Sequence, residues 1–162
     1  MKMTVSSDEH TPLVDAVIEA IEQRGHQVEY FGPRAGEAAR AAHDWPLVTA
    51  EAAGRVADGR ADGAVVMCWT GTGASLAANK LAGVRAALCH DAETARGARV
   101  WNHANVLALS LRATPIPIAR EILEAWFSTP YSDDAWNRQQ IERIRELERP
   151  LQAPGNRIEA GK

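Results

Sequence analysis

The chain is poor in cysteine and in basic charge, and it has no long apolar run. Its only two cysteines, Cys68 and Cys89, exclude a disulfide framework and a thiolate metal site, so we expect reduced thiols and no bound metal. No run is apolar enough to span a bilayer, and the first residues lack the apolar stretch of a signal peptide, which predicts a cytoplasmic protein without membrane contact. Lysine and arginine number 18 against 21 aspartate and glutamate, so nucleic acid is excluded as a partner and small molecules are expected.

What the chain does have is an alternation of strand-like and helix-like patterns. At 162 residues, with 46% hydrophobic content, it can form one domain with a substantial core. We predict a doubly wound α/β domain over residues 1–149, with five parallel strands and helices on both faces, followed by a flexible tail at 150–162. The expected strands cover residues 2–6, 28–31, 64–67, 84–88 and 106–109, and the expected helices 12–24, 46–57, 74–80, 92–100, 117–127 and 133–148.

The most informative segment runs from Gly63 to Lys80. Its apolar start ends at Cys68 and passes through a turn rich in glycine and threonine into a helical pattern. Backbone N–H groups at such a turn have no intrahelical partner and can bind a phosphate or stabilise an oxyanion, and Gly71 and Gly73 have no side chain to obstruct them. The same positive end favours the thiolate of Cys68, which makes this residue a candidate nucleophile or base. A structural cysteine in a packing turn is the alternative.

Polar residues follow three of the predicted strands, at residues 7–10, 68–75 and 110–112. Ligands of doubly wound sheets bind at the carboxyl ends of the strands, so these groups are expected to converge on one pocket. Asn102 and His103 lie instead just before the fifth strand. A neighbouring subunit is one way to bring them to the same pocket.

Four blocks of the sequence follow one another in a specific order and spacing. They are Cys68 to Ser75, Ala78-Asn79-Lys80, Gly83 to Cys89, and Asn102 with Asn105 to Ala108. In these blocks the chain resembles the ribose-5-phosphate isomerase B family, which also includes the subunits of galactose-6-phosphate isomerase. The resemblance implies a Rossmann-like fold and an aldose–ketose isomerase without metal or cofactor, acting on a sugar phosphate through a cis-enediolate. It also implies a homodimer or tetramer with active sites between subunits.

The resemblance assigns roles to the turn after the third strand. Cys68 matches the cysteine that moves the proton between C1 and C2, and Asp8 matches the acid of a motif after the first strand. Thr70 and Ser75 match hydroxyls that accompany the base. The matching cradle for the enediolate oxygens, which stabilises charge developing in the transition state, comprises Trp69, Gly71, Thr72, Gly73, Ala74 and Asn102.

The chain departs from the family at two acid–base positions. Trp101 stands where the family has its ring-opening histidine, and an indole can neither give nor take a proton in that role. His103, two residues further on, is a candidate substitute. Either Glu9 or His10 takes the histidine position of the motif after the first strand, and the sequence leaves both open.

The phosphate-binding end departs as well. Two arginines of the family, four residues apart near the last helix, align with Asn137 and Ile141. Arg112, after the fifth strand, does match a family arginine and is expected to hold the anion. Arg138 lies near the aligned positions without matching them and is a further candidate contact to the substrate.

Two tryptophans replace smaller residues of the family. Trp69 stands for a glycine and Trp45 for the tyrosine of an Asp-Tyr-Pro segment, and both are expected to narrow the pocket or stack on the sugar. We therefore expect an isomerase with a shifted substrate, a sugar phosphate like ribose 5-phosphate or shorter. The alternatives are an isomerase of an unphosphorylated sugar and a non-catalytic sugar or metabolite binder. A thiol-redox module is disfavoured because the two cysteines do not form a Cys-X-X-Cys motif.

Overall fold

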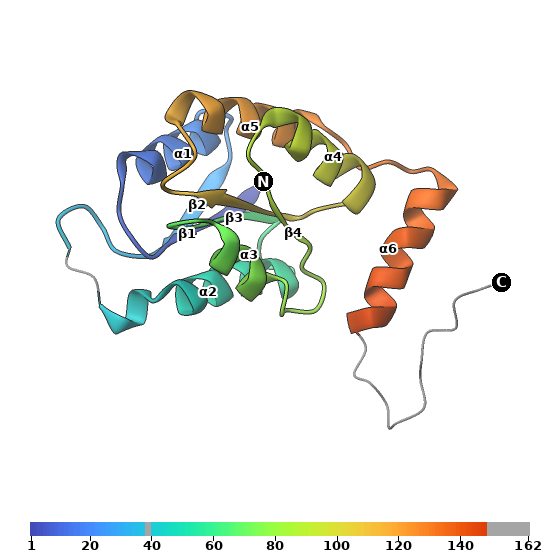
Figure 1. Cartoon of the computed structure of the whole chain (residues 1–162), viewed down its shortest axis with the longest axis horizontal. Coiled ribbons are helices and arrows are strands. Elements are labelled where there is room, and N and C mark those ends of the chain that lie inside the picture. The colour runs from blue at the N-terminus through green and yellow to red at the C-terminus, as the bar shows by residue number, and fades with distance from the viewer. Residues whose placement is uncertain (38–39, 149–162) are drawn as a thin grey trace, which may run out of the picture.

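The computed structural model describes residues 1–37 and 40–148, which fold into three layers, α/β/α (Figure 1). Within these residues five strands form one sheet in the order β2-β1-β3-β5-β4, and all neighbouring strands are parallel. This arrangement confirms the predicted doubly wound, Rossmann-like sheet. The strands are β1 (Lys2–Ser7), β2 (Gln27–Phe31), β3 (Gly63–Cys68), β4 (Ala86–Leu88) and β5 (Val106–Ser110).

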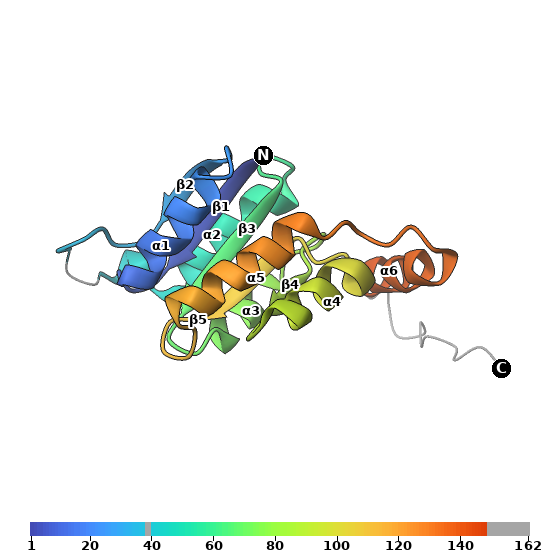
Figure 2. The ribbon, with the colours of Figure 1, turned by 90° about the horizontal axis from the view of Figure 1, so that it is seen from above.

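Helices cover both faces of the sheet, as Figures 1 and 2 show. α1, α4 and α5 pack on one face and α2 and α3 on the other, while α6 projects beyond the end of α4. A short 3-10 turn at Ala41–His43 precedes α2. The helices are α1 (Pro12–Glu22), α2 (Trp45–Ala57), α3 (Thr72–Ala78), α4 (Ala92–Asn102), α5 (Ile116–Ser128) and α6 (Ala135–Glu148).

The two faces of the sheet carry side chains of different size. Alternate residues of β3 and β5 point to opposite faces, and every residue of both strands is buried, as in a parallel sheet covered on both sides. Towards α1, α4 and α5 the central strands present large side chains, whereas towards α2 and α3 small residues allow close approach of the helices. The small set includes Ala52, Ala53, Ala64, Ala74, Ala78 and Ala108.

The element boundaries differ slightly from the predicted ones. α3 begins at Thr72 rather than at residue 74, because Gly71 in the left-handed conformation already reverses the chain. β4 begins at Ala86 rather than at residue 84, because the Asn79 side chain binds the N–H and C=O of Ala86 and holds the preceding residues in a turn. The tail predicted at 150–162 lies outside the described residues. Within those residues no helix combines the length and apolarity needed to cross a membrane.

The strand order reverses between β1 and β3. After β1 the chain adds β2 on one side, then crosses over to place β3 on the other side of β1. Loops that leave adjacent strands in opposite directions open a crevice at their carboxyl ends, where ligands of such folds bind. Asp8 begins the loop after β1, and Cys68 is the last residue of β3 before the loop into α3.

Candidate active site

Cys68 is the last residue of β3 and is buried at the start of the turn into α3. The backbone N–H of Ala74 donates to its Sγ at 3.4 Å. The register pairs Ser7 of β1 with Met67 of β3, so Asp8 and Cys68 each follow a paired residue at the carboxyl edge. A thiol that receives an amide N–H, next to a carboxyl group, is suited to proton transfer.

The turn from Trp69 to Gly73 has a backbone that only glycine can adopt at one position. Gly71 has a φ of +75°, and a Cβ there would lie 2.6 Å from Cδ1 of Leu88 and 2.9 Å from the carbonyl of Leu109. Thr70 and Thr72 flank it, with their hydroxyl oxygens 2.6 Å apart. Both threonines are exposed, so the turn offers hydroxyls and backbone amides on its open side.

The loop after β5 is fastened to this turn. Cys68 is paired in register with Ser110, whose hydroxyl donates to the Trp69 carbonyl at 2.9 Å. The backbone N–H of Arg112 donates to the same carbonyl at 3.1 Å, and the N–H of Leu111 donates to the Cys68 carbonyl at 3.0 Å. The Arg112 guanidinium lies 6.0 Å from the centre of the Trp69 ring. Cys68, Trp69 and Arg112 are therefore brought together, as the strand order predicts.

Trp45, the first residue of α2, reaches the same turn from the other side. A Cβ added at Gly73 would lie 3.1 Å from Cε3 of the Trp45 ring, so the indole rests against the glycine backbone. Trp45 and Trp69 are both exposed. The predicted contact of Trp45 with the site is thus supported by a direct contact to the cradle.

Asp8 has an unusual environment for a carboxyl group. Its Oδ1 is buried and has no hydrogen-bond partner among residues 1–37 and 40–148. Burial raises the pKa of Asp8, and the nearby charges of Glu9 and Asp44 raise it further. A carboxyl whose proton is held more tightly than usual is a stronger base than a free aspartate and can take part in proton transfer. Asp44, which the sequence did not single out for this role, contributes through its charge.

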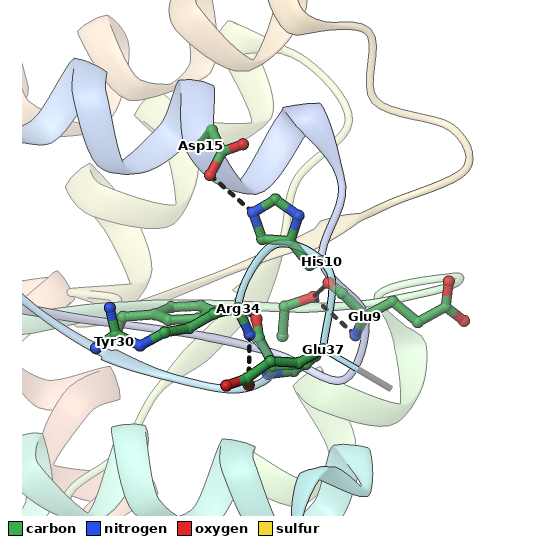
Figure 3. A network of polar contacts seen from close by, with 8 residues as sticks. Glu9, His10, Asp15, Tyr30, Arg34 and Glu37 are labelled. Carbon is green, nitrogen blue, oxygen red and sulfur yellow. Dashed lines mark hydrogen bonds and ion pairs between the residues drawn. The ribbon is translucent and has the colours of Figure 1, made fainter. Parts of the chain in front are cut away.

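The loop after β1 directs Glu9 and His10 to different places (Figure 3). The His10 Nε2 lies 2.9 Å from Oδ1 of Asp15 on α1, and the ring lines a cavity of about 470 Å³ beside Tyr30 and Arg34. The Glu9 side chain is exposed and points away from that cavity (Figure 3). His10 is therefore held on the α1 side of the loop, and Glu9 is free of that pairing.

Asn102 and His103 do not approach Cys68 within one chain. They end α4 just before β5 begins, which places them at the amino edge of the parallel sheet, opposite the carboxyl edge. His103 has a φ of +48°, its Nε2 donates to the Ser132 carbonyl at 2.8 Å, and its ring stacks on Tyr131 at 4.7 Å. Trp101 lies in the same last turn of α4.

Helix α6 carries the remaining predicted contact. Arg138 is exposed on α6, beyond the end of α4. Asn137 and Ile141, the positions aligned with the family's phosphate arginines, are buried instead. Because both side chains are buried and uncharged, neither can bind an anion as the arginines of the family would.

Cys89 provides a contrast to Cys68. It is fully buried in the core on the α1 side, and burial raises the pKa of its thiol to about 12. The interpretation of Cys89 as a small buried apolar residue is confirmed. Within the described ranges no group of three histidine, cysteine or acidic side chains is arranged to hold a metal ion.

Comparison with known proteins relates this arrangement to one family. The family model described as Ribose/Galactose Isomerase matches residues 3–145. Ribose-5-phosphate isomerase B of Escherichia coli K12 is 37% identical over 105 residues, which are 65% of this chain and 70% of that protein. A D-erythrulose-4-phosphate isomerase of Pectobacterium atrosepticum is 38% identical over 87 residues, 54% of this chain and 57% of that protein.

Solved structures agree with the sequence match. The type B ribose 5-phosphate isomerase of Trypanosoma brucei superposes with a TM-score of 0.82 at 35% identity, over 90% of this chain and 97% of that chain. The strand order, the turn after β3 and the extended sequence match support the same conclusion. The chain belongs to the ribose/galactose isomerase family.

Proposed function

We propose that the protein is an aldose–ketose isomerase that acts on a sugar phosphate, like ribose 5-phosphate or shorter, with Cys68 as the base. The observation that carries the proposal is the position of the Cys68 sulfur. It accepts the Ala74 N–H at 3.4 Å at the carboxyl end of β3, and Asp8 directly follows the neighbouring strand β1, at the point where the strand order reverses. A protein that only bound sugars would have no use for a thiol at this place.

The proposed reaction moves one proton between two carbons. The Cys68 thiolate takes the proton from C2 of the aldose, and the electron pair moves to form the enediolate. Backbone N–H groups between Trp69 and Ala74, together with Asn102, stabilise the enediolate oxygens as charge develops on them. Cys68 then returns the proton to C1, and Thr70 or Asp8 moves the hydroxyl proton between the two oxygens.

Two copies of the chain are needed to complete this site. Asn102 lies at the sheet edge opposite Cys68, so it can meet the enediolate only if a second copy contributes it. We therefore propose a homodimer or tetramer with active sites between subunits. The free thiols Cys68 and Cys89 suit the reducing conditions of the cytoplasm, where we expect the protein to work.

Three features support a short substrate. Trp45 packs against Gly73 and narrows the approach to the cradle. Trp101 stands in place of a ring-opening histidine, and a four-carbon ketose phosphate has no five-membered ring to open. Arg112, fastened to the Trp69 carbonyl, offers one cation for a phosphate. One relative is named for a substrate of this size, D-erythrulose 4-phosphate.

An unphosphorylated sugar is the second candidate substrate. It is favoured by the burial of Asn137 and Ile141, because neither side chain can contribute to binding a phosphate.

For the loop after β1 we propose Glu9 rather than His10 as the group that faces the substrate, because His10 is paired with Asp15.

Exchange of substrate hydrogen with solvent deuterium tests the proposal directly. Wild type and Cys68→Ala would be incubated in deuterium oxide with tetroses, pentoses and hexoses, each in phosphorylated and free form, and followed by NMR. We expect exchange at C1 or C2 of one substrate, and a loss of about 100-fold or more in Cys68→Ala, as for removal of a general base.

Cys89→Ala is the matched control, because Cys89 is buried away from the turn and its replacement should leave exchange unchanged. A Cys68→Ala rate within about threefold of wild type would show that Cys68 is not the base. Binding of one of these sugars without exchange in any of them would identify a binding protein instead. Exchange with a free sugar alone would select the unphosphorylated substrate.

A further inference from the structure

A second concavity lies away from Cys68, where α4 ends and α6 begins. It has a volume of about 410 Å³ and is lined by Trp101, Asn102, Trp136 and Gln140. Two indoles and two carboxamides thus surround it, and no ionisable side chain of the described residues lines it. Trp136 and Gln140 lie one turn apart on α6, facing the last turn of α4.

The Trp101 ring is seated on its own helix. It lies back over Gly97, where an added Cβ would be only 2.8 Å from Cζ3 of the ring. Gly97 is therefore the residue that allows the indole to lie flat on α4. Trp101 and Trp136 are nevertheless 60% and 65% exposed, the two highest values among the five tryptophans. Large exposed aromatic faces of this kind are typical of a surface that binds a ligand or another chain.

The two carboxamides differ in their freedom. Gln140 is fixed, because its Nε2 donates to the Trp136 carbonyl at 3.2 Å and its Oε1 accepts from Arg143 at 2.9 Å. Asn102 is exposed, and its side chain has no hydrogen-bond partner among residues 1–37 and 40–148. It keeps two donors and one acceptor for a ligand.

These groups match one ligand chemistry. Indole faces pack against the C–H face of a sugar, and a free carboxamide both donates to and accepts from hydroxyl groups. A phosphate would need a cation or a set of backbone amides, and no cation lines the concavity. We propose that Trp101, Trp136 and Gln140 bind the uncharged, hydroxylated carbons of the sugar, next to the reacting carbons whose oxygens Asn102 meets. That the ligand is a sugar rests on the proposed function.

The assignment also separates the two ends of the substrate. The reacting carbons lie at the turn after β3 of one copy, while the hydroxylated carbons stack between Trp101 and Trp136 of the other copy. Trp136 thereby becomes a specificity-determining residue that the sequence did not single out. Any phosphate is left to the side of Arg112, which lies with Trp69 on the opposite edge of the sheet.

A binding experiment tests this assignment without turnover. D-ribose and inorganic phosphate would each be titrated against the Cys68→Ala protein by saturation-transfer NMR, with and without Trp136→Ala. We expect Trp136→Ala to weaken D-ribose binding by about tenfold, the loss of one stacking contact, and to leave phosphate binding unchanged. Gly97→Ala, which displaces the Trp101 ring, should weaken D-ribose binding in the same way.

Leu147→Ala is the matched control, because Leu147 is also 65% exposed on α6 but lies outside this concavity. Molecular mass by light scattering would be followed in parallel. Unchanged D-ribose affinity in Trp136→Ala overturns the assignment, as does a loss of affinity that only follows dissociation of the subunits. The readout here is binding and not catalysis. An isomerase that lacks this sugar contact would exchange deuterium but bind D-ribose equally well with and without Trp136. A protein that has the contact but is no isomerase would lose D-ribose affinity in Trp136→Ala and show no exchange.

Discussion

Asp8 shows how position alters a single carboxyl group. It follows a strand directly, so its side chain sits against the packed end of the sheet instead of in open solvent. Burial and the neighbouring charges of Glu9 and Asp44 all raise its pKa above the usual value of 3.8. A group that holds its proton more tightly when folded lowers the stability of the fold once it is ionised.

This linkage predicts the pH dependence of stability. As pH rises from 3.8 through the raised pKa, the folded protein must ionise Asp8 at a cost that the unfolded chain does not bear. Asp8→Asn should therefore increase the free energy of unfolding at neutral pH, and the gain should shrink as the pH falls towards 4. Urea unfolding at several pH values measures this difference.

Asp133→Asn serves as the control, because Asp133 is exposed. A gain of stability in Asp8→Asn that does not change with pH would contradict the raised pKa. The same variant should lose isomerisation if Asp8 moves the hydroxyl proton, so stability and activity are expected to change in opposite directions.

At the scale of elements, the turn between β3 and α3 depends on one glycine. Gly71 turns the chain in the left-handed region, and its Cα lies against Leu88 and the Leu109 backbone. The hydrogen bonds from residues 110–112 then hold the turn against the end of β5. The left-handed backbone of Gly71 and packing between strands together shape the cradle.

Gly71→Ala should destabilise the protein by about 2–5 kcal/mol, from left-handed strain together with overpacking. Gly25→Ala is the comparison, because Gly25 also has a positive φ, +79°, but nothing lies within 4 Å of an added Cβ. That variant should lose only about 1–2 kcal/mol. Denaturant unfolding of the two proteins measures the difference, and equal losses would mean that packing against Leu88 and Leu109 adds nothing.

At the scale of the whole molecule, the candidate site is divided between two edges of the sheet. Cys68 lies at the carboxyl edge and Asn102 at the amino edge, so no movement of one loop can join them in one chain. α6 extends beyond the sheet (Figures 1 and 2). Its residues Trp136 and Leu147 are exposed. A second copy related by a twofold axis, with the amino edge of each chain against the carboxyl edge of the other, would complete two equivalent sites.

Subunit complementation tests this division. Cys68→Ala and Asn102→Ala should each be inactive alone, but a mixture refolded together should regain activity. In a mixed dimer one site carries both substitutions and the other carries neither, so equal amounts should recover about a quarter of wild-type activity. The isomerase assay on the substrate found by deuterium exchange measures this recovery. Mixed dimers that form and stay inactive would show that both residues act within one chain, whereas full activity of Asn102→Ala alone would show that Asn102 plays no part.

Much of the fold was predictable from short-range patterns. The alternation of strands and helices, and the placement of Cys68 at the end of an apolar strand, follow from periodicities of a few residues. The convergence of residues 68–75 with 110–112 was predictable because parallel strands align their carboxyl ends. Ser110 was not recognised as the residue that ties the two loops, although its place at the end of the fifth strand is a usable signal.

Other features depended on contacts between distant segments. The choice between Glu9 and His10 was open in the sequence, and the pairing of His10 with Asp15 distinguishes their environments. The contact of Trp45 with Gly73 joins two helices, and the exposure of Trp136 follows from the projection of α6.

The sequence by itself determined the α/β alternation, the glycine-rich turn after Cys68 and the family to which these blocks belong, because each depends on residues close together in the chain. Only the tertiary structure decided that Asn102 lies at the edge opposite Cys68, that His10 turns towards α1, and that Trp101 and Trp136 border one concavity. Such relations arise from how the strands are ordered and how helices pack on them. Packing of this kind is a property of the whole chain, and no local pattern encodes it.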